Sequence, residues 1–185
     1  SPSIAAEEIP QDKVTEFQEY FKGFRYISTR EYSGSNLVQK LTGNIAETLI
    51  DPTLLFDSEF WSRYEKQPQK MCQGRYAVCY FLGDPSQIDR IYEICHNESL
   101  AVIDILHDKR YLSLGPDEFI YLIHNAQKVF TDSYHGTIFS IIFHIPLVLC
   151  KREGTNVNMN SRFETLFSKL GIDNKQLQNM MSDVQ

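Results

Sequence analysis

The sequence is poor in the features that mark several large classes of protein. Its 185 residues include only 9 glycines, 7 prolines, 4 cysteines and 1 tryptophan. The longest apolar run, from Thr137 to Cys150, is interrupted by a serine, a histidine and a proline. A membrane-spanning helix needs about 20 mostly apolar residues. We therefore interpret this run as a buried helix, a turn and a buried strand.

Basic residues are outnumbered by acidic ones, which disfavours binding of nucleic acid. The chain carries 18 Lys and Arg against 24 Asp and Glu, a formal net charge of −6. This balance argues against a protein that binds nucleic acid through a diffuse basic face. We expect no nucleic-acid partner, although a small local group of cations can still bind one anion.

Several sequence motifs are absent as well. The chain has no CxxC pair, Walker loop, GxGxxG or GxSxG segment, so a P-loop NTPase or a nicotinamide-dependent enzyme is unsupported. Its unclustered cysteines do not have the spacing of a zinc site, and we expect reduced core cysteines, no metal and no cofactor. No secretory signal opens the sequence, and we expect a cytoplasmic protein.

Alternating strand and helix patterns dominate what is present. They predict an α/β fold with a doubly wound, mostly parallel sheet and helices on both faces. No internal repeat is evident. We divide the chain into an N-terminal segment (1–24), a Rossmann-type domain (25–172) and a tail (173–185). The predicted helices are 13–24, 31–41, 85–97, 116–125, 134–143 and 161–170, and the predicted strands are 25–29, 47–50, 76–82, 100–105, 128–131 and 147–150.

The turn between the strand 128–131 and the following apolar helix is rich in polar groups. In such sheets, ligands bind beyond the carboxyl ends of the strands, where helix N-termini offer unpaired N–H groups. Gly136 would let a ligand approach the backbone, and Ser133 and Thr137 would add hydroxyl donors. His135 would donate a hydrogen bond or a proton.

A second candidate is Arg30, which follows the strand 25–29. A guanidinium at this edge can form a bidentate contact with a carboxylate or phosphate. Both candidates also have simpler interpretations. Arg30 would pair with Glu31 or a nearby carboxylate on the surface, and Ser133 or Asp132 would cap the helix beside an incidental histidine.

Taken together and in order, these segments resemble the polysaccharide pyruvyl transferase family. The resemblance covers residues 25–172, and the segment with His135 is its most distinctive part. The matching segments are I-S-T-R-E (27–31) followed by Ser33-Gly34, D-P-T-L-L (51–55) with Trp61 downstream, G-P-D-E-F (115–119), T-D-S-Y-H-G-T-I-F-S (131–140), and N-S-R-F (160–163) leading to Leu170-Gly171.

The resemblance implies an architecture and a reaction. Family members resemble GT-B glycosyltransferases, with two Rossmann-like halves around a cleft. This chain looks like the C-terminal half, so a missing N-terminal half would complete the cleft, and the fragment alone is expected to be inactive. The implied reaction transfers a pyruvyl ketal (carboxyethylidene) group from phosphoenolpyruvate to two hydroxyls of a sugar. The acceptor would be a cell-surface polysaccharide or its lipid-linked precursor, which adds the inner face of the membrane as a location.

The resemblance also assigns residues. The Arg and His that the family uses on phosphoenolpyruvate map onto Arg30 and His135. We expect Arg30 to bind the carboxylate or phosphate, and the helix start, Tyr134 to Thr137 with Ser133 before it, to bind the other anion. His135 would be the general acid or a donor to the departing phosphate. Asp132 would orient His135 or cap the helix, and we favour the cap.

Two other classes of function remain as alternatives. A GT-B glycosyltransferase or sugar-nucleotide epimerase half-domain would bind a nucleotide sugar at the same turn. Tyr134 and His135 replace the small residues that close approach of a diphosphate requires, which disfavours it. A non-catalytic carbohydrate-binding module would use Trp61 and nearby tyrosines as a platform and would be indifferent to changes at Arg30 and His135.

Overall fold

A computed structural model describes residues 2–4, 6, 8–84, 86–150, 152 and 160–172. These residues form two units. The first unit comprises the described residues up to Pro52 together with 160–172, and the second those from Thr53 to 152. The predicted boundaries at 24/25 and 172/173 stay predictions.

The second unit is built on a four-stranded sheet. Its strands are β3 (Tyr76–Tyr80), β4 (Ala101–Asp104), β5 (Lys128–Thr131) and β6 (Leu147–Leu149). They pair in the order β4-β3-β5-β6, and every pair is parallel. The chain therefore reverses its direction across the sheet between β3 and β5, the place where ligands bind in open parallel sheets. The parallel sheet confirms the predicted fold class.

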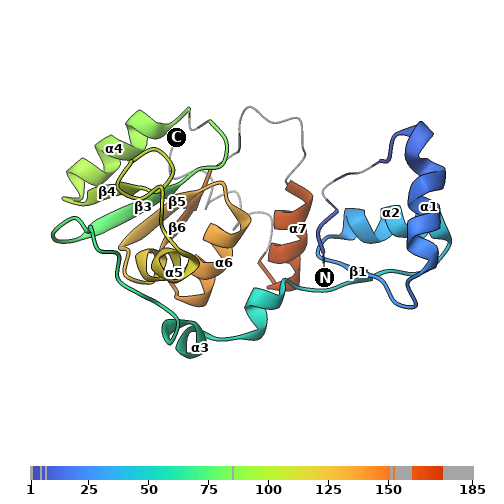
Figure 1. The fold of residues 1–185 in the computed structure, drawn as a ribbon. Coiled ribbons are helices and arrows are strands. Elements are labelled where there is room, and N and C mark those ends of the chain that lie inside the picture. The colour runs from blue at the N-terminus through green and yellow to red at the C-terminus, as the bar shows by residue number, and fades with distance from the viewer. Residues whose placement is uncertain are drawn as a thin grey trace. The chain divides into compact units, whose positions relative to one another are not determined.

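Helices cover both faces of this sheet. Figure 1 shows α4 (Ile88–Asn97) on one face and α5 (Pro116–His124) with α6 (Tyr134–Ile142) on the other. The strands are buried on both sides, as parallel strands require. Ala77, Cys79 and Phe81 face the buried side of α4. Tyr76 and Tyr80 face the other way, since the Tyr76 hydroxyl donates to the Leu122 carbonyl (3.2 Å) and the Tyr80 ring packs on Phe119.

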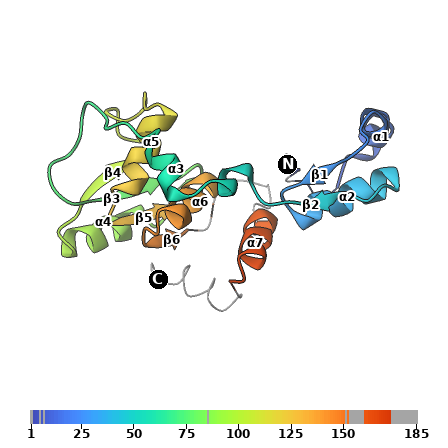
Figure 2. The same ribbon diagram turned by 90° about the horizontal axis from the view of Figure 1, so that it is seen from below.

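A short aromatic segment runs beside this core. It contains the 3-10 turn Pro52–Leu55 and helix α3 (Ser58–Ser62), which begins where the Asp57 carboxylate accepts the Phe60 N–H (2.8 Å). Helix α3 packs beside α5, as Figure 2 also shows.

The first unit holds one parallel strand pair, β1 (Ser28–Thr29) and β2 (Glu47–Thr48), connected by α2 (Tyr32–Thr42). The 3-10 turn Gln11–Lys13 leads into α1 (Val14–Lys22), which packs against α2. Helix α2 ends at Gly43, whose φ of 74° favours glycine. The carbonyl of Pro2 accepts the Arg30 N–H (3.0 Å), which ties the N-terminal segment to β1.

The last helix, α7 (Asn160–Lys169), also belongs to the first unit. The sequence predicted it as the closing helix of the regular run that starts at residue 76. Instead it packs against α2, and the Thr165 hydroxyl accepts the Tyr32 N–H (3.1 Å). Periodicity shows that a helix is amphipathic but not which surface it covers. Residue 85, at the start of the predicted helix 85–97, and the predicted tail 173–185 lie outside the described residues.

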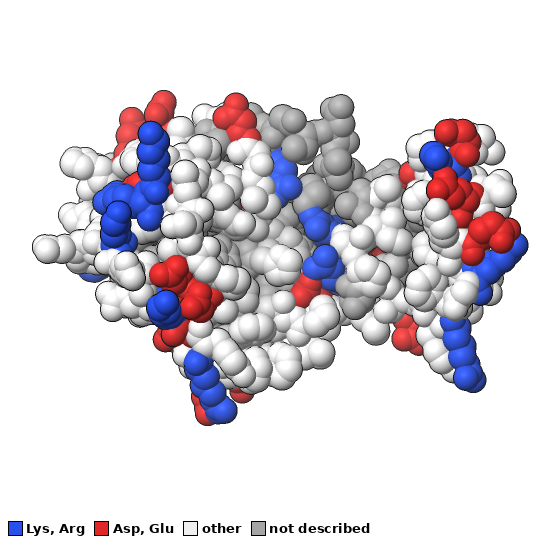
Figure 3. All heavy atoms as spheres, in the orientation of Figure 1, with Lys and Arg blue, Asp and Glu red and all other residues white. Residues whose placement is uncertain are grey.

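The charged side chains on the drawn face of the molecule do not form a diffuse basic surface. On the face drawn in Figure 3, acidic and basic side chains are mixed, and neither sign forms a large patch of its own. Among the residues described, no helix has the length and apolar character needed to cross a membrane.

Candidate functional site

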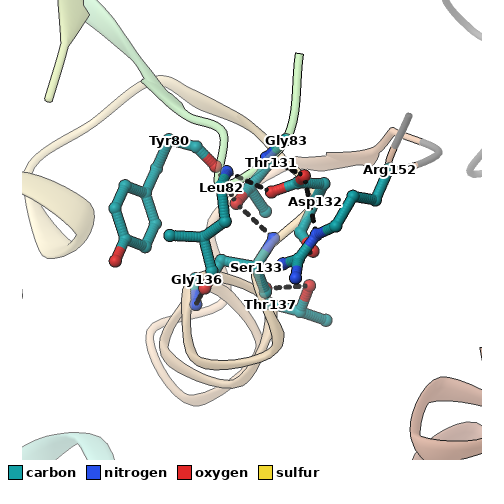
Figure 4. A network of polar contacts seen from close by, with 9 residues as sticks. All are labelled: Tyr80, Leu82, Gly83, Thr131, Asp132, Ser133, Gly136, Thr137 and Arg152. Atoms are coloured by element: carbon teal, nitrogen blue, oxygen red, sulfur yellow. Dashed lines mark hydrogen bonds and ion pairs between the residues drawn. The ribbon is translucent and has the colours of Figure 1, made fainter. Parts of the chain in front are cut away.

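The turn between β5 and α6 is shaped by Thr131, the last residue of β5. Its hydroxyl donates to the Tyr80 carbonyl (2.6 Å) and accepts the Ser133 N–H (3.0 Å), as Figure 4 shows. The first bond joins the ends of β5 and β3, and the second bends the chain into the helix. The start of α6 therefore lies at the point where the chain reverses across the sheet.

Helix α6 is capped by Ser133, which is one of the two caps that the sequence left open. The Ser133 hydroxyl accepts the Gly136 N–H (3.4 Å), and its carbonyl accepts both the N–H and the hydroxyl of Thr137 (3.0 Å each). The two hydroxyls expected to meet a ligand are thus engaged inside the turn. The role of Ser133 and Thr137 in binding stays a prediction.

His135 differs from its neighbours in exposure. In the segment 131–140 it alone is exposed, whereas Tyr134 and the remaining residues are buried. The Tyr134 ring meets the imidazole edge to face, with centroids 5.8 Å apart. Helix α6 is buried because most of its surface is apolar. His135 is therefore the exposed titratable side chain at the positive end of the helix.

Gly136 has a packing role at this turn. A Cβ at this position would lie 2.8 Å from Thr131 Oγ1, closer than real Cβ contacts allow, and at a tight 3.2 Å from Thr131 Cγ2. The glycine therefore lets α6 approach the end of β5. The sequence attributed it to the approach of a ligand, and that contact stays a prediction.

The expectation that Asp132 caps the helix is wrong. Its carboxylate is 2 % exposed and accepts the N–H groups of Leu82 (2.7 Å) and Gly83 (2.9 Å), which follow β3. It also accepts a bond from Arg152 Nε (3.0 Å). A carboxylate with four acceptor positions can hold all three donors, and it does so because the parallel sheet brings the ends of β3, β5 and β6 together. Sequence reasoning missed Arg152.

Two titratable groups near Asp132 are held in their neutral form. Burial, and secondly the Asp132 charge, raises the pKa of the Cys150 thiol to about 12. Burial is also the main cause that raises the pKa of Tyr80, again followed by Asp132. At neutral pH both groups keep their protons, so Cys150 does not provide a thiolate nucleophile.

In the first unit, Arg30 occupies the corresponding position after β1. Its Nη1 forms an ion pair with the Asp51 carboxylate, and the two side chains are 16 % and 3 % exposed. Asp51 belongs to the D-P-T-L-L segment, so two segments of the family resemblance meet here. The simpler interpretation of Arg30 is right about the partner, a nearby carboxylate, but wrong about its place, because the pair is largely buried and not on the surface. A fixed guanidinium is also what a preorganised anion site requires.

Glu31, the other carboxylate proposed for Arg30, has different partners. It is fully buried, and its Oε1 accepts the hydroxyl of Ser3 (3.1 Å) and the N–H of Ile4. These bonds hold the N-terminal segment against the start of α2.

The turns after β1 and β5 share a short sequence pattern. Thr29 to Ser35 reads T-R-E-Y-S-G-S, and Thr131 to Thr137 reads T-D-S-Y-H-G-T. In both, a buried threonine ends a strand, and a glycine of the next helix packs against it, with the added Cβ of Gly34 3.2 Å from Thr29. The spacing T-x-x-Y-x-G was readable from the sequence alone.

Two other histidines lie away from this turn. His144 interrupts the apolar run and is exposed, with a φ of 56°, because helix α6 ends before it. His107 bonds through Nδ1 to Asp104 (3.0 Å). The Trp61 indole donates to the Thr53 carbonyl (3.1 Å) and packs on Phe139, which supports a packing role and disfavours a carbohydrate platform.

The chain is an α/β protein with an exposed histidine in the first turn of a helix, beyond the carboxyl ends of its parallel strands. The family model of polysaccharide pyruvyl transferase matches residues 3–153. The chain therefore belongs to the polysaccharide pyruvyl transferase family, which confirms the resemblance. Membership implies an enzyme of the transferase class with a sugar acceptor. Among curated proteins, none matches the chain.

Proposed function

We propose that this protein transfers a pyruvyl ketal group from phosphoenolpyruvate to two hydroxyls of a sugar and releases phosphate. The acceptor is a cell-surface polysaccharide or its lipid-linked precursor. The observation that best supports this function is His135, the one exposed side chain of its turn, at the positive end of α6 and at the reversal point of the sheet.

The donor carries two anionic groups. The family resemblance assigns Arg30 of the first unit, held by buried Asp51, to the carboxylate or phosphate. In the second unit, the dipole and N–H groups at the start of α6 favour a negatively charged group. Gly136 and Thr137 already donate their N–H groups to Ser133, so the positive end of the helix and the His135 ring contribute most.

Ketal formation needs no reactant other than phosphoenolpyruvate and the two sugar hydroxyls. The methylene carbon of the donor gains a proton, and one sugar hydroxyl bonds to the adjacent carbon. The C–O bond to phosphate then breaks, and the second hydroxyl closes the ketal. One hydroxyl proton ends on the new methyl group and the other on phosphate. His135 delivers a proton to the methylene carbon or donates to the leaving phosphate.

Donor binding tests the proposal directly. We expect phosphoenolpyruvate to shift the backbone amides of 133–137 and the His135 ring in NMR spectra of the 185-residue chain. Arg30→Ala and His135→Ala should each weaken this response at least tenfold. The matched controls Arg25→Ala and His144→Asn, which change an arginine and a histidine outside the site, should leave it unchanged. A response to a uridine-diphosphate sugar alone would instead support the sugar-nucleotide alternative.

Turnover separates the two roles of His135. In the complete enzyme, with a sugar acceptor supplied, phosphate release should fall by about 10²–10⁴-fold in His135→Ala, as expected for a general acid. His135→Gln keeps an N–H donor but cannot transfer a proton. Activity restored by Gln would assign His135 to the phosphate, and activity absent from both variants would assign it to proton delivery. Full activity in both variants would exclude His135 from the reaction.

A further inference from the structure

The Asp132 carboxylate joins loops that follow three different strands. Leu82 and Gly83 follow β3, Asp132 follows β5, and Arg152 follows β6. Figure 4 shows the carboxylate between the β3 loop and the guanidinium. The proposed function assigns no role to Arg152, although the Arg152 side chain is only 13 % exposed.

Arg152 contacts Asp132 at two points. Its Nε donates to the carboxylate (3.0 Å), and its Nη2 donates to the Asp132 backbone carbonyl (3.0 Å). The second bond fixes the peptide plane that leads into Ser133, the cap of α6. A guanidinium reaches both acceptors at once because its donors form a rigid planar fork, whereas a lysine ammonium is a single point.

We propose that Arg152 is a positioning residue for the turn that carries His135, and that it acts through Asp132. The carboxylate sets the distance of this turn from the β3 loop, and the bond to the carbonyl sets its direction. Together they decide where the His135 ring stands at the sheet edge. The effect on donor binding rests on the proposed function, whereas the effect on the turn does not.

The first unit supplies an independent parallel. There too, the residue after the strand-ending threonine pairs with an opposite charge that lies just beyond the next parallel strand. Arg30 pairs with Asp51 after β2, and Asp132 pairs with Arg152 after β6. The signs are reversed, but the two pairs occupy the same positions relative to the strand ends. The same pairing occurs in both turns with the charges exchanged. This indicates that each turn needs an ion pair between two strand ends, whichever residue carries the positive charge.

The NMR spectrum of the unaltered 185-residue chain gives the first test. The Nε–H of Arg152 should exchange with water at least tenfold more slowly than that of Arg110, an exposed arginine paired with Asp108 in the same unit. Equal exchange rates would overturn the proposal, because they would mean that the bond to Asp132 does not persist in solution.

Variants give the second test. Arg152→Lys and Arg152→Gln should shift the amides of 82–83 and 133–137 and the His135 ring, and should weaken the phosphoenolpyruvate response at least tenfold. Arg110→Gln is the matched control and should change neither. A purely stabilising role would lower the urea midpoint of the variants but leave the shifts of the folded protein in place, which would overturn the proposal. Wild-type behaviour of Arg152→Lys would also overturn it, since charge alone would then suffice.

The proposed function and the positioning role of Arg152 can each be disproved without the other. If phosphoenolpyruvate gives no response in the unaltered protein, the proposed function is wrong, while the ligand-free shifts still decide the role of Arg152. Should Arg152→Gln not fold, Arg152→Lys and the Nε–H exchange rate decide it.

Discussion

Replacing Gly136 by alanine tests how closely α6 must approach β5. The added Cβ would meet Thr131 Oγ1 at 2.8 Å and Cγ2 at 3.2 Å. Thr131 cannot move away cheaply, because it is fully buried and its hydroxyl is bonded to the Tyr80 carbonyl and the Ser133 N–H. Either the helix shifts away from the strand or these bonds lengthen.

The magnitude follows from three opposing contributions. Overpacking a buried site costs about 1–3 kcal/mol, and weakening one hydrogen bond costs about 1 kcal/mol. The higher helix propensity of alanine returns about 1 kcal/mol. We therefore expect Gly136→Ala to destabilise the second unit by about 2 kcal/mol, about a thirtyfold change in its unfolding equilibrium.

Urea unfolding followed by tryptophan fluorescence measures this change in the right unit. The chain has 1 tryptophan, and the ring of this residue, Trp61, lies 5.2 Å from that of Phe139 on α6. The control is the same change in a Thr131→Ala background, where Oγ1 and Cγ2 are absent. There the cost of Gly136→Ala should fall by at least 1 kcal/mol. Equal costs in both backgrounds, or a stabilised Gly136→Ala protein, would refute the reasoning.

Three further changes can be followed with the same fluorescence. His144→Gly should stabilise the second unit by about 1 kcal/mol, because it removes a side chain from a left-handed backbone; a lower urea midpoint would contradict this. The raised pKa of Cys150, about 12 against 9.0 unfolded, means that the native state keeps a proton that the unfolded state releases. Stability is therefore intact below pH 9 and falls as the pH rises towards 12, by about 1.4 kcal/mol at pH 10 through this group. Cys150→Ser should flatten that slope, and an unchanged slope would exclude the thiol as its source. Asp57→Ala should cost about 1 kcal/mol by removing the cap of α3, and Asp57→Asn should retain most of it.

Some of the site was readable from local sequence because its causes are local. The strand Lys128–Thr131 and the helix start at Tyr134 follow from β-branched and apolar patterning and from a serine cap. The fold class follows from the alternation of such segments. Strands at 25–29 and 47–50 were predicted too long, since only two residues of each pair in the sheet.

The order of strands and helices and the T-x-x-Y-x-G turn could be derived from the sequence, because both depend on neighbours a few residues apart. The parallel sheet was indicated by the alternation of these segments. The roles of Asp132 and Arg152, in contrast, emerge only from the tertiary structure. The Asp132 partners lie 49 and 50 residues upstream and 20 downstream, and only the strand order brings them together. The packing of α7 on α2 also emerges only from the tertiary structure, because the apolar face of a helix does not specify which surface it packs against.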